Sequence, residues 1–100
     1  MPNYTLEFHL LAREEVSDAY QYYENQKPGL GDDFFEALDH IFDLILDNPN
    51  LFPKDFEEVR KATLKKFPFT IYYEVVEDQI FVYSVFHQSR NPVDWQRRVQ

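Results

Sequence analysis

Cysteine is absent from the chain, and glycine occurs only twice in 100 residues. Without a thiol the protein cannot hold a disulfide framework, a thiolate metal site or a cysteine nucleophile, which fits a reducing compartment. With so little glycine and 44% hydrophobic residues, the chain can bury a core and is expected to be ordered. One hundred residues predict a single domain, residues 1–100.

Long hydrophobic runs are also missing. No apolar stretch approaches the roughly 20 residues that a membrane span needs, and the N-terminus shows no basic and apolar signal region. We therefore expect a cytoplasmic protein without a membrane partner.

Basic residues are scarce, and they are unevenly spread. The formal net charge is −8; residues 1–58 carry a net charge of −11, whereas residues 59–100 carry +3. This asymmetry predicts either two surfaces with different partners or, more simply, a well-solvated acidic helical face.

The first half of the chain has two kinds of period. Residues 4–10 alternate apolar and polar side chains, which predicts a short strand. From Ala12 the period becomes that of a helix, which Lys27-Pro28-Gly29 should end. Its acidic residues are expected outside the apolar stripe: Glu14, Glu15, Asp18 and Glu24.

A second amphipathic helix is predicted from Asp32 or Asp33, whose carboxylate would cap it, to Asn48-Pro49. Because the linker between the two helices is short, they should form an antiparallel hairpin.

The second half reads as three strands and a short helix. Residues 59–64, 69–76 and 80–87 are rich in β-branched and aromatic residues, with a turn at 77–79, and a terminal helix should begin near Pro92. The predicted fold is α+β: an N-terminal strand, an antiparallel helix hairpin packed on an antiparallel sheet of the C-terminal half, and a short C-terminal helix.

Several motifs together resemble the RelE/ParE superfamily of toxins from type II toxin–antitoxin systems, and most closely its ParE or plasmid-stabilisation branch. The segments that carry the resemblance are Gly29-Leu30-Gly31-Asp32, Asn48-Pro49, Arg60, Leu64, Phe67-Pro68-Phe69-Thr70-Ile71-Tyr72-Tyr73 and His87-x-x-Arg90-x-Pro92-x-x-Trp95-x-x-Arg98. The resemblance implies a RelE/ParE-like fold and a cytoplasmic bacterial toxin that a cognate antitoxin neutralises. Within the superfamily, ParE-like members are associated with inhibition of DNA gyrase, and RelE-like members resemble ribosome-dependent mRNA endonucleases.

A nuclease would need cations for the phosphate and groups that move protons. Arg60 and Arg90 could hold the phosphate, and His87 could move a proton. Glu58 or Glu74 could act as the base. RelE-like enzymes carry a proton-transfer group near the C-terminus, however, and Trp95 at the approximately matching position cannot serve as an acid or base. We therefore favour a toxin that binds its target over an enzyme, and we expect no metal and no cofactor.

The same residues have a structural interpretation. The His87 ring can bond the neighbouring turn, Arg90 can bind a carboxylate or backbone carbonyls, and Trp95 can fold back onto the sheet edge. For partner binding, the basic half should attract an acidic antitoxin segment. The predicted partner-binding residues are Arg60, Lys61, Lys65, Lys66, Arg90, Trp95, Arg97 and Arg98. Gyrase, the ribosome with its mRNA, and a degenerate non-toxic role all stay open, as do the antitoxin's identity and the oligomeric state.

Overall fold

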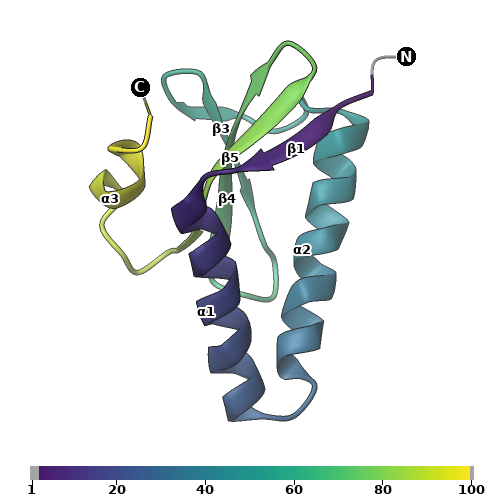
Figure 1. The fold of residues 1–100 in the computed structure, drawn as a ribbon, viewed down its shortest axis with the longest axis vertical. Helices are drawn as coiled ribbons and strands as arrows, with labels where there is room; N and C mark the ends of the chain where they lie inside the picture. The colour runs from purple at the N-terminus through teal and green to yellow at the C-terminus, as the bar shows by residue number, and fades with distance from the viewer. Residues whose placement is uncertain (1–2, 100) are drawn as a thin grey trace.

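The computed structural model describes residues 3–99, which form a five-stranded sheet, a helix hairpin and a short terminal helix (Figure 1). The elements are β1 (Thr5–Phe8), α1 (Leu10–Gln26), α2 (Leu30–Asp47), β2 (Lys54–Phe56), β3 (Val59–Thr63), β4 (Phe69–Val76), β5 (Gln79–His87) and α3 (Val93–Gln96). Within these residues, no helix is both long and apolar enough to cross a membrane.

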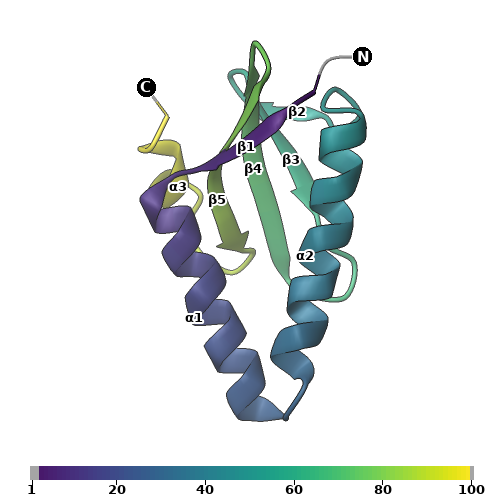
Figure 2. The same cartoon turned by 45° about the vertical axis from the view of Figure 1, so that its right-hand side comes forward.

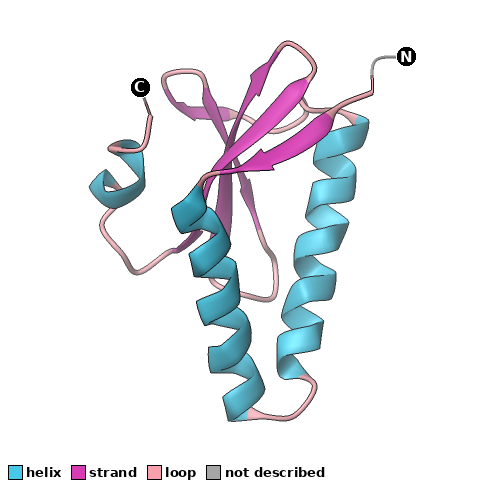
Figure 3. Ribbon diagram, in the orientation of Figure 1, coloured by secondary structure: helices cyan, strands magenta, loops and turns pink. Residues whose placement is uncertain are grey.

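The sheet has the strand order β1-β5-β4-β3-β2. Strands β2 to β5 pair antiparallel with their neighbours, while β1 runs parallel to β5 at the edge. Figure 2 shows the two long helices as the arms of a V, with β3, β4 and β5 visible between them. The predicted α+β arrangement is confirmed, including the helix hairpin and the short C-terminal helix (Figure 3).

Most of the core lies between the helix hairpin and one face of the sheet. Its buried residues come from both helices and from β3, β4 and β5. Phe34 on α2 and Phe69 on β4 pack at a ring-centroid distance of 5.2 Å, and Tyr23 and Phe67 enclose them. Edge-to-face and tilted contacts of this kind stabilise the core beyond what the burial of apolar area contributes.

The tip of the hairpin departs from its predicted form. α2 begins at Leu30, two residues before the expected caps, after Gly29 in a left-handed conformation with φ of 90°. Glu24 of α1, expected to be solvated, accepts hydrogen bonds from the backbone N–H groups of Gly29 and Gly31, each at 3.0 Å. A carboxylate from the preceding helix therefore performs the capping that the sequence assigned to Asp32 or Asp33.

Two further differences concern the strands. β1 ends at Phe8, so Leu10 begins α1 and is 68% exposed instead of facing the core. β2 was not predicted, because its three residues are partly charged and too short to show an alternating pattern.

Tyr73 on β4 ties the sheet to the end of α2. Its side chain is fully buried, and its hydroxyl donates a 2.7 Å hydrogen bond to the carbonyl of Pro49. Burial raises the pKa of Tyr73 to about 12. The phenol is therefore held neutral, with its proton committed to one carbonyl.

Tyr73→Phe should lower the free energy of unfolding by about 1 to 3 kcal/mol, because the buried Pro49 carbonyl loses its donor. Tyr22→Phe is the matched control, since Tyr22 is 59% exposed, and it should change stability by less than about 0.5 kcal/mol. Urea unfolding of both variants measures the difference. Equal stabilities would show that the Tyr73 hydroxyl contributes nothing.

Candidate functional site

The outer edge of β5 lacks a neighbouring strand beyond Val82, where its pairing with β1 stops. Beyond that point, side chains bond to the backbone groups of β5 in place of a strand. Glu15 of α1 accepts a 3.1 Å hydrogen bond from the backbone N–H of Val85, and Arg98 donates a 2.9 Å hydrogen bond to the carbonyl of Tyr83. Two side chains thus satisfy strand groups that would otherwise lie unpaired.

Glu15 and Arg98 also bind each other. Both guanidinium nitrogens Nη1 and Nη2 of Arg98 donate to the carboxylate, at 3.0 and 2.8 Å. The side chains are only 7% (Arg98) and 11% (Glu15) exposed, and Ser84 Oγ adds a 2.8 Å bond to the carboxylate. The prediction that Glu15 lies outside the buried face of α1 was wrong, because the apolar period of a helix does not reveal a buried ion pair.

Trp95 of α3 is buried on the second face of the sheet. Its ring stacks on Tyr72 at 3.9 Å and meets Phe56 edge-on at 5.6 Å. Together with Val59 and Phe86 it forms a small cluster opposite the helix hairpin. The chain's own terminal segment therefore covers this aromatic face. Trp95 folds back onto the sheet as expected, but it packs on the face of the central strand β4 and not on the sheet edge.

His87 and Arg90 make the contacts expected of a structural clasp. The Nδ1 atom of His87 accepts hydrogen bonds from the Ser89 N–H at 3.1 Å and pairs with Ser89 Oγ at 2.7 Å. The Nη1 atom of Arg90 lies 3.4 Å from Oε2 of Glu15, and its Nη2 atom lies 3.3 Å from Oδ2 of Asp94. Both residues hold the turn that leads from β5 to α3.

Arg60 lies apart from this turn. Its Nη1 donates to the carbonyl of Phe52 at 2.7 Å. Arg60 pairs across the sheet with Tyr73, whereas His87 pairs with Phe69, four residues away along β4. At roughly 3.3 Å per residue this is a separation of about 13 Å along the strand. The structure brings His87 and Arg90 together but leaves Arg60 elsewhere.

The two carboxylates considered as bases are engaged. The hydrogen bond from Lys54 and its charge lower the pKa of Glu58, which makes that carboxylate a weaker base. Glu74 accepts a 2.9 Å hydrogen bond from the hydroxyl of Tyr83, whose pKa is raised to about 12 by burial and then by this bond. In residues 3–99, no cluster of three or more His, Asp or Glu side chains could hold a metal ion.

The other predicted partner-binding residues differ in exposure. Lys61 pairs with Asp55 at 3.3 Å, while Lys65, Lys66 and Arg97 are exposed. Trp95 and Arg98 are buried within the chain. A partner role for those two stays a prediction that requires the terminal segment to move.

An open groove of about 470 Å³ lies between α1 and the ends of β4 and β5. Ala19, Tyr22 and Tyr23 form its α1 side, and Phe69 and Val85 belong to the strands. Its charged or titratable lining residues are Glu15, Asp18, His87 and Arg90. Sequence reasoning missed this groove, although the exposed Tyr22 within an otherwise acidic helix surface was a signal for it.

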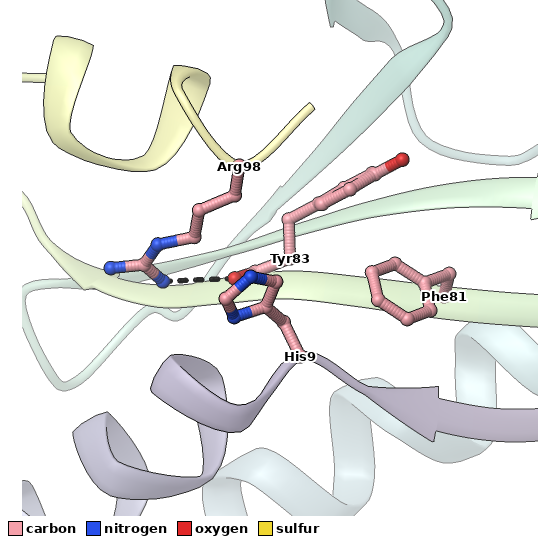
Figure 4. A pocket seen from close by; sticks show the side chains of 4 residues that line it. All are labelled: His9, Phe81, Tyr83 and Arg98. Atoms are coloured by element: carbon pink, nitrogen blue, oxygen red, sulfur yellow. Dashed lines mark hydrogen bonds between the residues drawn. The ribbon is translucent and has the colours of Figure 1, made fainter. Parts of the chain in front are cut away.

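A second hollow, of about 320 Å³, lies where β1 passes into α1 (Figure 4). It is lined by His9, Phe81, Tyr83 and Arg98. The His9 Nδ1 atom caps α1 by accepting from the Leu11 N–H at 3.1 Å, and Arg98 is held by Glu15 and the Tyr83 carbonyl. Because these polar groups already have structural partners, the larger groove is the better candidate site.

Glu15→Gln should lower the free energy of unfolding by about 3 kcal/mol, because it leaves the buried Arg98 guanidinium without its counter-charge. Asp18→Asn, an exposed carboxylate three residues along the same helix, should cost less than about 0.5 kcal/mol. Chemical denaturation of the two purified variants tests this. If Glu15→Gln is as stable as Asp18→Asn, the ion pair is not what secures the terminal segment.

Comparison with known proteins agrees with the fold. The sequence model of the family described as "ParE toxin of type II toxin-antitoxin system, parDE" matches residues 6–92. Among curated proteins, no sequence matches the chain.

Two solved structures are similar. One belongs to the chromosomal ParDE toxin–antitoxin system from P. aeruginosa; it has a TM-score of 0.74 and 16% identity, over 87% of this chain and 98% of that one. The other is the E. coli toxin RelE, an arginine-to-alanine double mutant in the free state; it has a TM-score of 0.73 and 20% identity, over 98% of this chain and 99% of that one.

At these identities the two structures establish the RelE/ParE-like fold alone. The family match, which spans most of the chain, goes further. This chain belongs to the ParE toxin family of type II toxin–antitoxin systems.

Proposed function

We propose that this toxin acts in the bacterial cytoplasm by binding a protein target, and that a cognate antitoxin neutralises it by placing an acidic, amphipathic segment in the groove between α1 and β5. The observation that carries the proposal is the groove itself. The exposed Tyr22 and the partly exposed Tyr23 line it above a floor of buried apolar side chains, on a protein whose net charge is −8. Such a surface is typical of protein interfaces.

Charge at the groove supports an acidic segment. Arg90 lines the groove, and Lys65 and Lys66 lie in the loop that precedes the lining residues Pro68 and Phe69. Arg90 lies beside an apolar lining that would hold a partner's apolar side chains. Asp18 is the exposed carboxylate of the groove, and it would favour a segment whose charges are placed away from α1.

The arrangement of the predicted catalytic residues favours binding over RNA cleavage. Arg60 lies about 13 Å along the sheet from His87 and bonds backbone carbonyls. Trp95 covers the aromatic face of the sheet, so the aromatic rings of that face are not free to stack on RNA bases. A nuclease that uses all three predicted residues would need Arg60 beside His87 and Arg90, and Arg60 lies apart from them here.

DNA gyrase is the target that we propose to test first, on the family resemblance. One of the similar structures comes from a ParDE toxin–antitoxin system, and that pairing motivates the antitoxin for this chain. The toxin itself contributes a groove lined by Tyr22, Tyr23 and Phe69, and no cofactor enters the proposal.

Induction of the toxin in bacterial cells should stop growth with filamentation and DNA damage, while transcripts stay intact. Co-expression of the antitoxin encoded beside it should restore growth. Purified gyrase assayed for DNA supercoiling with the toxin, and with toxin plus antitoxin, gives the molecular readout. Rapid translation arrest with cleaved transcripts and undamaged DNA would contradict the proposal, and so would unaffected growth.

Tyr22→Glu should abolish the complex with the antitoxin, because it places a charge on the apolar side of the groove. Gln21→Glu is the matched control, since it adds the same charge to the neighbouring exposed position of α1, outside the groove lining. Calorimetric titration with purified antitoxin measures both. Equal affinities for the two variants would place the antitoxin elsewhere on the toxin.

A further inference from the structure

We infer that Arg90 is the receptor for a partner carboxylate at the groove: an Asp or Glu side chain of the antitoxin takes over the place that Glu15 holds on the Arg90 guanidinium. This inference rests on the proposed function and deepens it, because it names the group that the partner must supply. It depends on how the charges around Glu15 are shared.

Glu15 is bound by more donors than a carboxylate holds well. Its Oε1 atom accepts from Ser84 Oγ, the Val85 N–H and Arg98 Nη1, and its Oε2 atom accepts from Arg98 Nη2 and Arg90 Nη1. Oε1 therefore has three donors and Oε2 has two, for about two lone-pair sites on each oxygen. The contact with Arg90 is the longest, at 3.4 Å, against 2.8 to 3.1 Å for the others. Arg90 is therefore the most weakly bound of the five donors, and Glu15 keeps four shorter hydrogen bonds without it.

The second anion on Arg90 is also held weakly. Asp94 lies four residues along the chain, and its Oδ2 atom is 3.3 Å from Arg90 Nη2. The side chains of Arg90 and Asp94 are 46% and 42% exposed. Exposed pairs of this kind contribute between zero and about 1 kcal/mol. By contrast, Arg98 is 7% exposed, and both of its Nη atoms are already bonded, to Glu15 and to the Tyr83 carbonyl. Of the two arginines on Glu15, only Arg90 is available to a partner.

Arg90 is nevertheless well positioned. Its guanidinium lies 4.7 Å from the centroid of the Phe86 ring, which supports the planar group on one side. It lines the groove at the end of β5, beside His87. A planar guanidinium held against a ring can bind a carboxylate through two parallel hydrogen bonds, which the flexible ammonium groups of Lys65 and Lys66 cannot do.

The test compares Arg90→Gln with Lys66→Gln, which removes the same charge from an exposed position near the groove. With purified antitoxin, Arg90→Gln should raise Kd about 30-fold or more, as expected when one partner of a hydrogen-bonded charge pair is removed. Lys66→Gln should raise Kd by no more than about fivefold. Thermal unfolding of Arg90→Gln should match wild type within a few degrees, because Glu15 keeps its other four donors.

The partner's carboxylate is then identified by replacing each Asp and Glu of the antitoxin's toxin-binding segment with Asn or Gln. One of these changes should weaken binding to wild-type toxin and have little further effect on Arg90→Gln. If Arg90→Gln and Lys66→Gln weaken binding equally, or if no acidic residue couples to Arg90, this inference is wrong while the proposed function stands. A wild-type toxin that does not bind the antitoxin overturns both.

Discussion

The structure depends on a single buried carboxylate. Glu15 of α1 accepts a hydrogen bond from the Val85 N–H at the free edge of β5. It also accepts two hydrogen bonds from Arg98 in the terminal segment. The hairpin, the sheet and the C-terminus thereby meet at one group. Removing water from such an ion pair is costly, and it is stable because the carboxylate has donors on both oxygens and the guanidinium binds it through two nitrogens.

This arrangement satisfies the unpaired backbone groups at the exposed edge of β5. β1 is short and covers only Gln79–Val82 of β5, so the remaining edge would be open to pairing with another chain. Glu15 and Arg98 occupy the strand's hydrogen-bonding groups from the side. With these backbone groups already bonded, the groove beside the edge is the surface that we propose for partner binding.

Much of the fold follows from the sequence because its periods are strong. The two helices, β4 and the turn into β5 agree closely with the apolar pattern of the sequence. The family that the motifs resemble also predicted how these elements are arranged. The prediction failed where one long-range contact decides the outcome. Glu24 caps α2 from the preceding helix, and Glu15 pairs with a residue 83 positions away, so neither appears in a local pattern. The groove was missed for the same reason, since α1 and the end of β5 come together only in the folded chain.

The account makes the groove between α1 and β5 the surface that the antitoxin covers. Hydrogen exchange of the toxin, measured with and without bound antitoxin, tests this most directly because it maps contact along the backbone. The account predicts slower exchange in residues 15–23 of α1 and in residues 85–90, which form the end of β5 and the turn after it. Protection confined to β2, β3 and the terminal helix, with exchange in those two segments unchanged, would contradict it.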